Sequence, residues 1–306
     1  MLKNLTQNNK TSKYNNLVHD ENQYLNLIYD IINEGTMVNS RNGNALTVYG
    51  SVMHFDLTNN KIPILTTKKT AWKTCLKELF WFIKGCTNNQ ELKDQNVKIW
   101  DGNSSREYLD SIGLAHYEEN DLGPVYGHQW RHFNAQYENR FTDYNNKGID
   151  QLKYIIDCLK DPNKRYSRRL IMSAWNPCQI NEMALPPCHI LCQFNVIGNE
   201  LSCSMYQRSC DVGLGVPFNI ASYAFLTCIL AKHCDLIPKD FCYNMGNCHI
   251  YDDHIEMLKM QMKHIPYNFP NIEIKNKHEN IDDYCLEDIE ISNYESHKQI
   301  KMVMRV

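Results

Sequence analysis

Cys188 and Arg208 are the two residues whose types and spacing most clearly predict chemistry. Cys188 follows a pair of prolines, and Arg208 precedes Ser209 in the next predicted strand. A free thiol is mostly protonated at neutral pH, whereas the attacking species is the thiolate, which a nearby arginine favours. The chain has thirteen cysteines, and most are expected to be small buried apolar groups. The local sequence distinguishes Cys188 from them and predicts a nucleophile.

A predicted hairpin over residues 189–208 brings these side chains together. Its two halves are rich in branched and aromatic residues, and the Gly-Asn pair between them is typical of a tight turn. Pairing about that turn places Cys188 opposite Ser209 and His189 opposite Arg208. Because neighbouring residues of a strand point to opposite faces, a hydrolase-type dyad of Cys188 with His189 is not expected.

Glu78 is a second group with predicted chemistry, because it lies inside an almost wholly apolar helix predicted over residues 72–84. A carboxylate is costly to bury without a partner or a role. Burial is therefore expected to raise the pKa of Glu78 toward the range that is useful for moving protons at neutral pH.

The elements that must position these residues predict the α+β class. Besides the hairpin, we predict helices over residues 21–34, 72–84, 151–160, 218–231 and 253–263, and strands over residues 47–57, 170–175, 272–274 and 287–291. Walker and GxGxxG loops are absent from the sequence, and the strands outnumber the crossovers that a parallel sheet needs. We expect a large mixed sheet covered by helices.

The composition of the 306-residue chain fits one domain. Pro-, Gly- or Ser-rich linkers do not divide it, its hydrophobic content is 43%, and its net charge is -3. We predict a polar N-terminal tail over residues 1–20 and a catalytic domain over residues 21–306. The charge gives no basis for general binding to nucleic acids or membranes, so local arginines must hold any anionic ligand.

Cysteine usage predicts a reducing compartment. The cysteines have no CxxC spacing, which argues against a disulfide framework or a structural zinc site, and no metal is expected. The N-terminal sequence lacks the apolar core of a signal peptide, and the longest apolar stretch, residues 218–231, is short for a membrane span and is interpreted as a buried helix. We expect the protein in the cytoplasm, with the nucleus as a second location.

Motifs along nearly the whole chain resemble the thymidylate synthase/deoxycytidylate hydroxymethylase family, and specifically its folate-dependent thymidylate synthases. These motifs are KELFWF at 77–82, IWD at 99–101, GPVYG at 123–127, SRR at 167–169, LPPCH at 185–189, YQRSCD at 206–211, LGVPFNIASY at 214–223 and CHIY at 248–251. The resemblance runs from about residue 22 to residue 306. It implies a homodimer that forms through the sheet.

The resemblance implies a methyltransferase that converts deoxyuridine monophosphate (dUMP) to thymidylate. The co-substrate 5,10-methylenetetrahydrofolate would donate both the one-carbon unit and a hydride, leaving dihydrofolate. The implied catalytic residues are Cys188, Glu78, Tyr126, Arg208 and Asn219. The Cys188 sulfur would attack carbon-6 of uracil, which makes the neighbouring ring carbon nucleophilic. Glu78, with ordered water, would relay protons to the uracil carbonyl, and Tyr126 would lie near the proton lost from carbon-5.

The nucleotide site implied by the resemblance is polar and rich in arginine. Its residues are Arg41, Arg208 and Ser209 with Arg168 and Arg169 of a second subunit at the phosphate, Asn219 at the edge of the base, and His249 and Tyr251 at the ribose hydroxyl. Gln207 and Asp211 are also assigned to the nucleotide site. Arginine suits a phosphate monoester because its N–H groups form a fixed fork. On the residues alone, Arg168 and Arg169 are also explained as a solvated basic pair, and Asn219 as a helix cap. His249 and Tyr251 are also explained as half-buried polar residues of one strand face.

The implied folate site needs a flat surface for the pterin ring and a carboxylate for its N–H groups. Its residues are Trp100 and Asp211 at the pterin, Phe218 at the benzoyl portion, Lys98 and Lys301 at the glutamate tail, and Val306, whose carboxylate would close over both ligands. Leu214 and Gly215 are also assigned to the folate site.

Three positions depart from the family pattern. The loop that carries Arg41 is one residue shorter than the usual family sequence. Asn247 occupies a position that is usually acidic, and Arg305 replaces a small penultimate residue. The reach of Arg41 and the closure of the C-terminal segment are therefore questions for the structure.

Two other functions compete with this interpretation. A pyrimidine hydroxymethylase of the same family lets water capture the methylene intermediate instead of reducing it. Asn219 favours uracil over cytosine, and Trp100 with an intact C-terminus favours exclusion of water and hydride transfer. Some synthases of this family also bind messenger RNA, but the sequence has no basic stripe or aromatic-basic motif that supports nucleic-acid binding as the main role.

Overall fold

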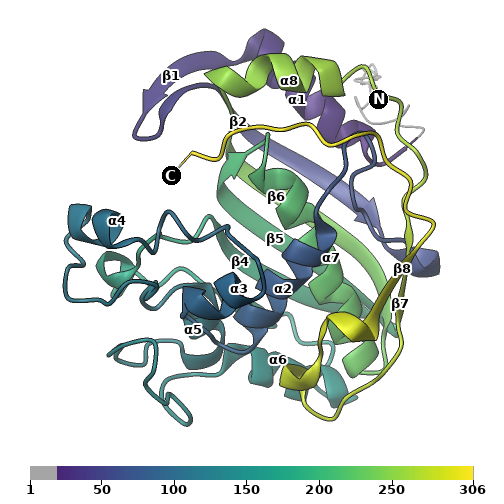
Figure 1. Ribbon diagram of the computed structural model, residues 1–306. Coiled ribbons are helices and arrows are strands. Elements are labelled where there is room, and N and C mark those ends of the chain that lie inside the picture. Colours follow the sequence, from purple (N-terminus) through teal and green to yellow (C-terminus); the bar gives the residue numbers. More distant parts are fainter. Residues whose placement is uncertain (1–18, 306) are drawn as a thin grey trace, which may run out of the picture.

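A six-stranded mixed sheet forms the centre of the structure, a computed structural model that describes residues 19–305 (Figure 1). Its strands are β1 Thr36–Ser40, β2 Gly43–Asp56, β3 Ile171–Ser173, β4 His189–Ile197, β5 Glu200–Asp211 and β6 Ile237–Tyr251. The spatial order is β1-β2-β6-β5-β4-β3. β5 and β6 run parallel, and the other neighbouring strands are antiparallel. The predicted α+β class with a large mixed sheet is confirmed.

Helices pack on one face and around the ends of this sheet (Figure 1). They are α1 Asn22–Glu34, α2 Trp72–Ile83, α3 Asn89–Asp94, α4 Arg106–Ser111, α5 Tyr126–His132, α6 Gln151–Lys160, α7 Gly215–His233 and α8 Ile255–Gln261. A second sheet pairs β7 Asn271–Ile274 with β8 Ile289–Ser292. One hydrophobic core connects these elements, so residues 19–305 form a single domain. The tail predicted over residues 1–20 lies outside the described residues except for its last two.

α7 is the central helix and connects the parallel strands β5 and β6. Its apolar residues occur on all sides, which is typical of a helix buried in a large core. It is longer than the predicted stretch of residues 218–231. By length and composition alone, it is long and apolar enough to cross a membrane. However, 78% of its most apolar window is buried inside the protein, so the interpretation as a buried core helix is confirmed.

The β4–β5 hairpin follows the predicted register over most of its length. Pairs from Ile197 with Glu200 through Leu191 with Tyr206 are those that a turn at Gly198 and Asn199 requires. A β-bulge between His189 and Leu191 then shifts the pairing, so that His189 lies opposite Gln207. The predicted pairing of His189 with Arg208 is therefore wrong by one residue. A bulge bends a strand and redirects its side chains, and this one lies next to Cys188.

β1 and most of β6 were not predicted from the sequence. β1 is exposed along its whole length, so it lacks an apolar alternation, and it extends β2 back to Gly43 by pairing with it. β6 pairs on both sides, with β2 and β5, although it contains Pro238, Asp240 and Gly246, which are uncommon in strands. Its position at the centre of the sheet outweighs these local preferences.

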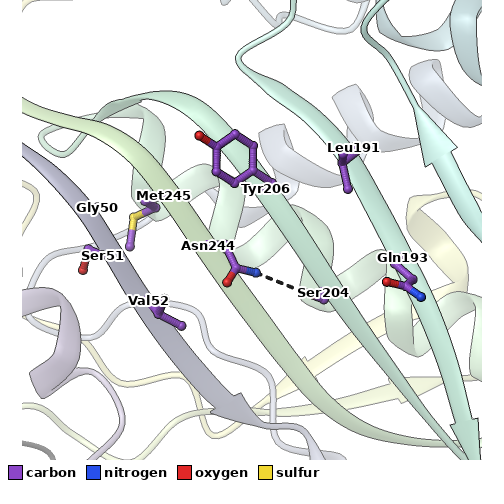
Figure 2. Close-up of a pocket in the computed structure, with 9 residues that line it drawn as sticks. All are labelled: Gly50, Ser51, Val52, Leu191, Gln193, Ser204, Tyr206, Asn244 and Met245. Carbon is purple, nitrogen blue, oxygen red and sulfur yellow. Dashed lines mark hydrogen bonds between the residues drawn. The ribbon is translucent and has the colours of Figure 1, made fainter.

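The face of the sheet that is turned away from α7 is partly exposed. Figure 2 shows residues of this open sheet face, which we define as Gly50, Ser51, Val52, Leu191, Gln193, Ser204, Tyr206, Asn244 and Met245. They come from β2, β4, β5 and β6, and Asn244 Nδ2 donates to Ser204 Oγ at 3.0 Å. Tyr49, on the neighbouring part of β2, is 82% exposed. The opposite face of the same strands is buried, as the alternation along β5 shows.

Candidate active site

Cys188 lies just before β4, between α5 and β5. Its backbone N–H donates to Tyr126 Oη at 2.7 Å, and its carbonyl accepts from the Arg208 N–H at 2.9 Å. Tyr126 is the first residue of α5 and is buried, whereas Cys188 itself is half-buried. The structure therefore brings together three of the predicted catalytic residues, one from each of these segments.

The electrostatic state of the Cys188 thiol is a balance of opposing effects. Burial raises the pKa of the thiol, whereas the charge of Arg208 and a hydrogen bond with Tyr126 lower it. The net pKa lies above that of a free cysteine. Arg208 favours the thiolate, as expected, but desolvation outweighs the nearby cation, so the thiol is less acidic than a free cysteine.

The guanidinium of Arg208 is used in part to hold the backbone before Cys188. Nε donates to the Pro187 carbonyl and Nη2 to the Pro186 carbonyl, both at 2.8 Å. The same guanidinium lies 5.4 Å from the centre of the Trp175 ring. These contacts explain the local sequence, because the two prolines present carbonyls to the arginine in a fixed conformation.

Glu78 lies inside α2, as predicted, and has one hydrogen-bond partner that the sequence did not reveal. Trp100 Nε1 donates to Glu78 Oε1 at 2.8 Å. Burial raises the pKa of Glu78 from 4.5 to about 7, and the bond from Trp100 opposes that rise. The prediction of a carboxyl group that titrates near neutral pH is confirmed.

His189 is separate from the reactive thiol. Its Nδ1 is hydrogen-bonded to Tyr223 Oη at 2.7 Å, and its ring stacks on Tyr126 with 4.2 Å between centroids. Burial lowers its pKa to about 3, so the imidazole is neutral. The expectation that Cys188 and His189 do not form a dyad is confirmed. The His189 ring instead packs against the ring of Tyr126.

The parallel pair β5–β6 places several predicted nucleotide-binding residues side by side. Ser209 pairs with Asn247 and Asp211 with His249. Asn247 Oδ1 is hydrogen-bonded to His249 Nδ1 at 2.9 Å, and burial lowers the pKa of His249, which keeps it neutral. Asn247, the unusual residue of this segment, therefore fixes the orientation of the His249 ring without adding charge.

Gln207 is buried and already hydrogen-bonded. Its Nε2 donates to the Ser209 carbonyl at 2.8 Å, and its Oε1 accepts from Tyr243 Oη at 2.7 Å. We conclude that this amide orders the backbone that carries Ser209, which supports the site indirectly.

Asp211 ends β5 and shapes the turn into α7. Its Oδ1 accepts from the N–H groups of Gly213 and Leu214, at 2.9 and 3.2 Å. Among the described residues, no hydrogen bond to Oδ2 is present, so that oxygen can accept from a ligand.

The explanation of Asn219 as a helix cap is wrong, because α7 begins at Gly215 and Asn219 lies within the helix.

Arg41 occupies the two-residue turn between β1 and β2. Its Nε donates to Asn42 Oδ1 at 2.9 Å, and its Nη1 donates to Tyr108 Oη at 3.4 Å. The charge of Arg41 also lowers the pKa of Cys188, so the short loop still brings this cation to the site. Arg41 is exposed, and its hydrogen bonds fix its direction.

Arg168 and Arg169 lie elsewhere, in the segment between α6 and β3. Both are exposed, and within residues 19–305 neither contacts the Cys188 site. The Arg168 carbonyl accepts from Gln193 Nε2 at 3.1 Å, and Gln193 belongs to the open sheet face. The two arginines therefore border that face, where a second molecule has access to them.

The predicted folate residues divide into a central group and a peripheral group. Trp100 is buried with its ring 5.9 Å from that of Tyr126, and Phe218 is half-buried at the start of α7, after Leu214 and Gly215. Lys98 and Lys301 are exposed. Val306 lies outside the described residues, so the predicted closure by its carboxylate stays a prediction.

Lys68 and Asn42 belong to the site although the sequence did not indicate them. Lys68 Nζ is buried and donates to the Gly213 carbonyl at 2.5 Å, and burial lowers its pKa to about 8, against the charge of Asp211. Asn42 accepts a hydrogen bond from Arg41, and its side chain lowers the pKa of Tyr251. A pair of lysines after two threonines, and an asparagine in a hairpin turn, are too common to predict these positions.

These contacts define a site of the cysteine-nucleophile class, in which a tyrosine and an arginine hold the backbone of the cysteine and a protonatable carboxyl group lies nearby. Comparison with known proteins identifies the family. The family model described as Thymidylate synthase matches residues 22–306. The chain belongs to the thymidylate synthase family.

Curated relatives support this assignment. The chain is 50% identical over 303 residues to a bifunctional dihydrofolate reductase-thymidylate synthase of Paramecium tetraurelia, with 99% of this chain and 65% of the relative covered. It is 50% identical over 289 residues to the corresponding protein of Zea mays, with coverage of 94% and 55%. It is 49% identical over 287 residues to the corresponding protein of Plasmodium chabaudi, with 94% of this chain and 49% of the relative covered. The chain thus spans about half to two thirds of the length of these relatives.

Proposed function

We propose that this chain catalyses the reductive methylation of dUMP to thymidylate with 5,10-methylenetetrahydrofolate, giving dihydrofolate. The observation that carries the proposal is the position of Cys188 between Tyr126 and Arg208, within a family match over residues 22–306. The relatives' names include a reductase activity as well, and this proposal concerns only the synthase reaction.

Nucleotide binding prepares the thiol for attack. A phosphate monoester at Arg41, Arg208 and Ser209 would orient the uracil ring toward Cys188 Sγ, because the guanidinium fork fixes the anionic end. The sulfur then adds to carbon-6, the electron pair of the carbon-5–carbon-6 double bond moves toward the uracil carbonyl, and the thiol proton passes to water. Since burial keeps the resting thiol protonated, we propose that thiolate formation accompanies nucleotide binding and does not precede it.

Proton transfer at the base is assigned to Glu78 and Tyr126. With a pKa of about 7, the Glu78 carboxyl exchanges a proton at neutral pH and suits a relay to the uracil carbonyl through water. Burial holds the pKa of Tyr126 well above its usual range, so its phenol stays neutral and serves as a hydrogen-bonding group near carbon-5. Asn219, which presents an amide from within α7, is suited to pair with the edge of uracil.

The residues of the folate site fit a flat heterocycle. Asp211 Oδ2 is available to ring N–H groups, and Trp100 and Phe218 supply aromatic surface. The bound folate supplies the one-carbon unit and the hydride. Trp100 excludes water from this side and, through its bond to Glu78, couples the folate surface to the proton relay.

We further propose that a second copy of the chain covers the open sheet face. Exposed side chains of this part of the sheet include Tyr49, Val52 and Leu191, and an apolar patch of this kind is typical of an interface. Arg168 and Arg169 border the same face but lie away from Cys188 of their own chain. A two-fold homodimer gives them a role, because each pair would reach the phosphate site of the partner.

We propose a reducing compartment for this enzyme, the cytoplasm or the nucleus.

The test of the reaction is direct. The purified chain is incubated with dUMP and methylenetetrahydrofolate, and dihydrofolate formation is followed by absorbance. Stoichiometric dihydrofolate and thymidylate support the proposal. Hydroxymethyl product without dihydrofolate would assign the chain to the hydroxymethylases of the family, and no product from dUMP would contradict the proposal.

Cys188→Ala is predicted to abolish turnover while the protein still binds dUMP, because the phosphate is held by arginines and not by the thiol. Turnover and equilibrium binding are measured on the same preparation. In the parent protein, a fluorinated dUMP analogue with the folate is expected to give an adduct whose mass maps to Cys188. Cys178 and Cys285 are more exposed and serve as internal controls. An adduct at either of them, or an active Cys188→Ala variant, would refute the covalent role.

A further inference from the structure

Arg305 is bound at the end of the described chain by three kinds of contact. Its Nη2 lies 3.1 Å from Asp252 Oδ1 and 2.9 Å from Asp253 Oδ1. Its guanidinium carbon is 5.6 Å from the centre of the Tyr251 ring. Its Nη1 would lie 3.2 Å from a methyl group placed on Gly43, in the β1–β2 turn. One side chain therefore connects the C-terminal segment with the end of β6 and with the hairpin of Arg41.

The residues before Arg305 are fixed to the same part of the molecule. His254 Nε2 donates to the Val303 carbonyl at 2.8 Å. Met302 packs against the core, and its sulfur would lie 3.2 Å from a methyl group placed on Gly213. Figure 1 shows this segment running past α8 and ending near the β1–β2 side of the sheet. The segment is therefore docked on the body of the protein.

The contacts of Arg305 continue into the nucleotide site. The Tyr251 ring that it covers is 5.3 Å from the ring of His249, the other residue proposed for the ribose. The Asn42 side chain lowers the pKa of Tyr251 and accepts from Arg41 Nε at 2.9 Å. Arg305 therefore lies against Tyr251 on one side and, at Gly43, beside the hairpin that carries the cation proposed for the phosphate on the other.

We propose that Arg305 is a positioning residue, which clamps the C-terminal segment against Asp252 and Asp253 and so holds Tyr251 and the Arg41 hairpin ready for the nucleotide. Arg305 does not reach the reacting atoms, and it acts through Tyr251 and Arg41. This inference rests on the proposed function for the identity of the nucleotide. The contacts of Arg305 themselves are independent of that identity.

The size of the expected effect follows from the exposure of the ion pairs. The side chain of Arg305 is 31% exposed, and those of Asp252 and Asp253 are 44% and 39% exposed, so solvent screens much of their attraction. The contact with the Tyr251 ring adds a modest cation–π attraction. We therefore expect Arg305→Ala to weaken dUMP binding about three- to fivefold, and the loss to shrink at high salt as the ion pairs are screened.

The experiment combines dUMP binding by calorimetry with amide hydrogen exchange of the same proteins. Arg305→Ala should raise the Kd for dUMP and increase exchange at residues 41–43 and 302–305, whereas Arg305→Lys, which keeps the charge but not the fork, should fall between it and the parent. Replacing Asp252 and Asp253 together by asparagine should reproduce the effect and should not add to Arg305→Ala, because the groups act as one unit. Lys259→Ala is the matched control, since Lys259 pairs with Glu256 at 2.7 Å on the surface of α8.

The outcomes separate this inference from the function on which it rests. An unchanged Kd for Arg305→Ala would overturn the positioning role, whatever happens to exchange. Additive effects of the arginine and aspartate replacements, or an equal effect of Lys259→Ala, would also overturn it. If the parent protein fails to bind dUMP, the proposed function is wrong, and the clamp is then judged by exchange at residues 41–43, where no change would refute it.

Discussion

At the scale of single residues, Glu78 carries a stability cost that its chemistry explains. Burial raises the pKa of its carboxyl from 4.5 to about 7 in the folded protein. Between these two values the unfolded chain has released the proton and the folded chain retains it. The folded state then binds more protons, so stability falls as the pH rises through this window. The full difference corresponds to as much as about 3 kcal/mol above pH 7.

Glu78→Gln is predicted to remove this pH dependence. The amide keeps an oxygen for the Trp100 N–H but cannot ionise. Relative to the parent, the variant should therefore gain up to about 3 kcal/mol in the free energy of unfolding between pH 5 and pH 8. Urea unfolding at both pH values measures this difference. Glu107→Gln, at an exposed position of α4, is the control and should keep the pH dependence of the parent. A Glu78→Gln variant that follows the parent at both pH values would contradict the raised pKa.

The residues of the site differ in how far their sequence predicts them. Glu78 was predictable because its apolar neighbours along one helix already imply burial. The position of Cys188 at the site was predictable, but the pKa of its thiol was not. Burial raises that pKa more than the charge of Arg208 lowers it. Lys68 and Asn42 could not be predicted, since their partners are distant in sequence or lie in a turn of common composition.

At the scale of elements, the parallel pair β5–β6 depends on Gly246. A methyl group at this position would lie 2.8 Å from Tyr206 Oη, 3.1 Å from the Arg208 carbonyl oxygen and 3.5 Å from Arg208 Cα. The first contact involves the movable end of a side chain, but the others involve the backbone that carries the active-site arginine. The glycine therefore lets β6 approach β5 where Arg208 is positioned.

Gly246→Ala is predicted to lower stability by about 1–3 kcal/mol, as overpacking of a filled site does, and to weaken dUMP binding by displacing Arg208. Urea unfolding and calorimetry measure the two effects. Tyr206→Phe in the same chain separates the two contacts, because it removes Oη and leaves the contact with Arg208. If this second substitution restores both stability and binding, the tyrosine contact decides the outcome and the role assigned to the Arg208 backbone is wrong.

The sequence predicts elements well where local patterns agree with the fold. Alternation and a Gly-Asn turn gave the register of the β4–β5 hairpin as far as Leu191 and Tyr206. The bulge beyond that point was not predictable, because no feature of the strand sequence indicates it. It occurs where Arg208 binds the carbonyls of Pro186 and Pro187. β6 was missed for a related reason, since pairing on both sides stabilises a strand that its own composition disfavours.

At the scale of the whole molecule, Arg168 and Arg169 are the predicted phosphate-binding residues that one chain does not bring to its own site. The pair lies beside the open sheet face and away from the thiol of its own chain. The SRR motif resembled the family pattern, and its predicted role depends on a second copy of the chain, which no local pattern of one sequence specifies. The exposed Tyr49 and Val52 on that face support the proposal that a second copy of the chain covers it.

Mixing two inactive variants tests whether sites are completed across a dimer. Cys188→Ala lacks the nucleophile and Arg168→Ala lacks the proposed donated cation. In a heterodimer of the two, the site with the intact thiol receives the intact arginine, so activity should return. With free exchange, half the dimers are mixed and each has one complete site, which predicts about a quarter of the parent activity. Cys188→Ala mixed with Arg208→Ala is the matched control, because both residues belong to the same chain's site and neither site of the mixed dimer is then complete. Recovery in both mixtures, or in neither, would refute the donation of Arg168 across the interface.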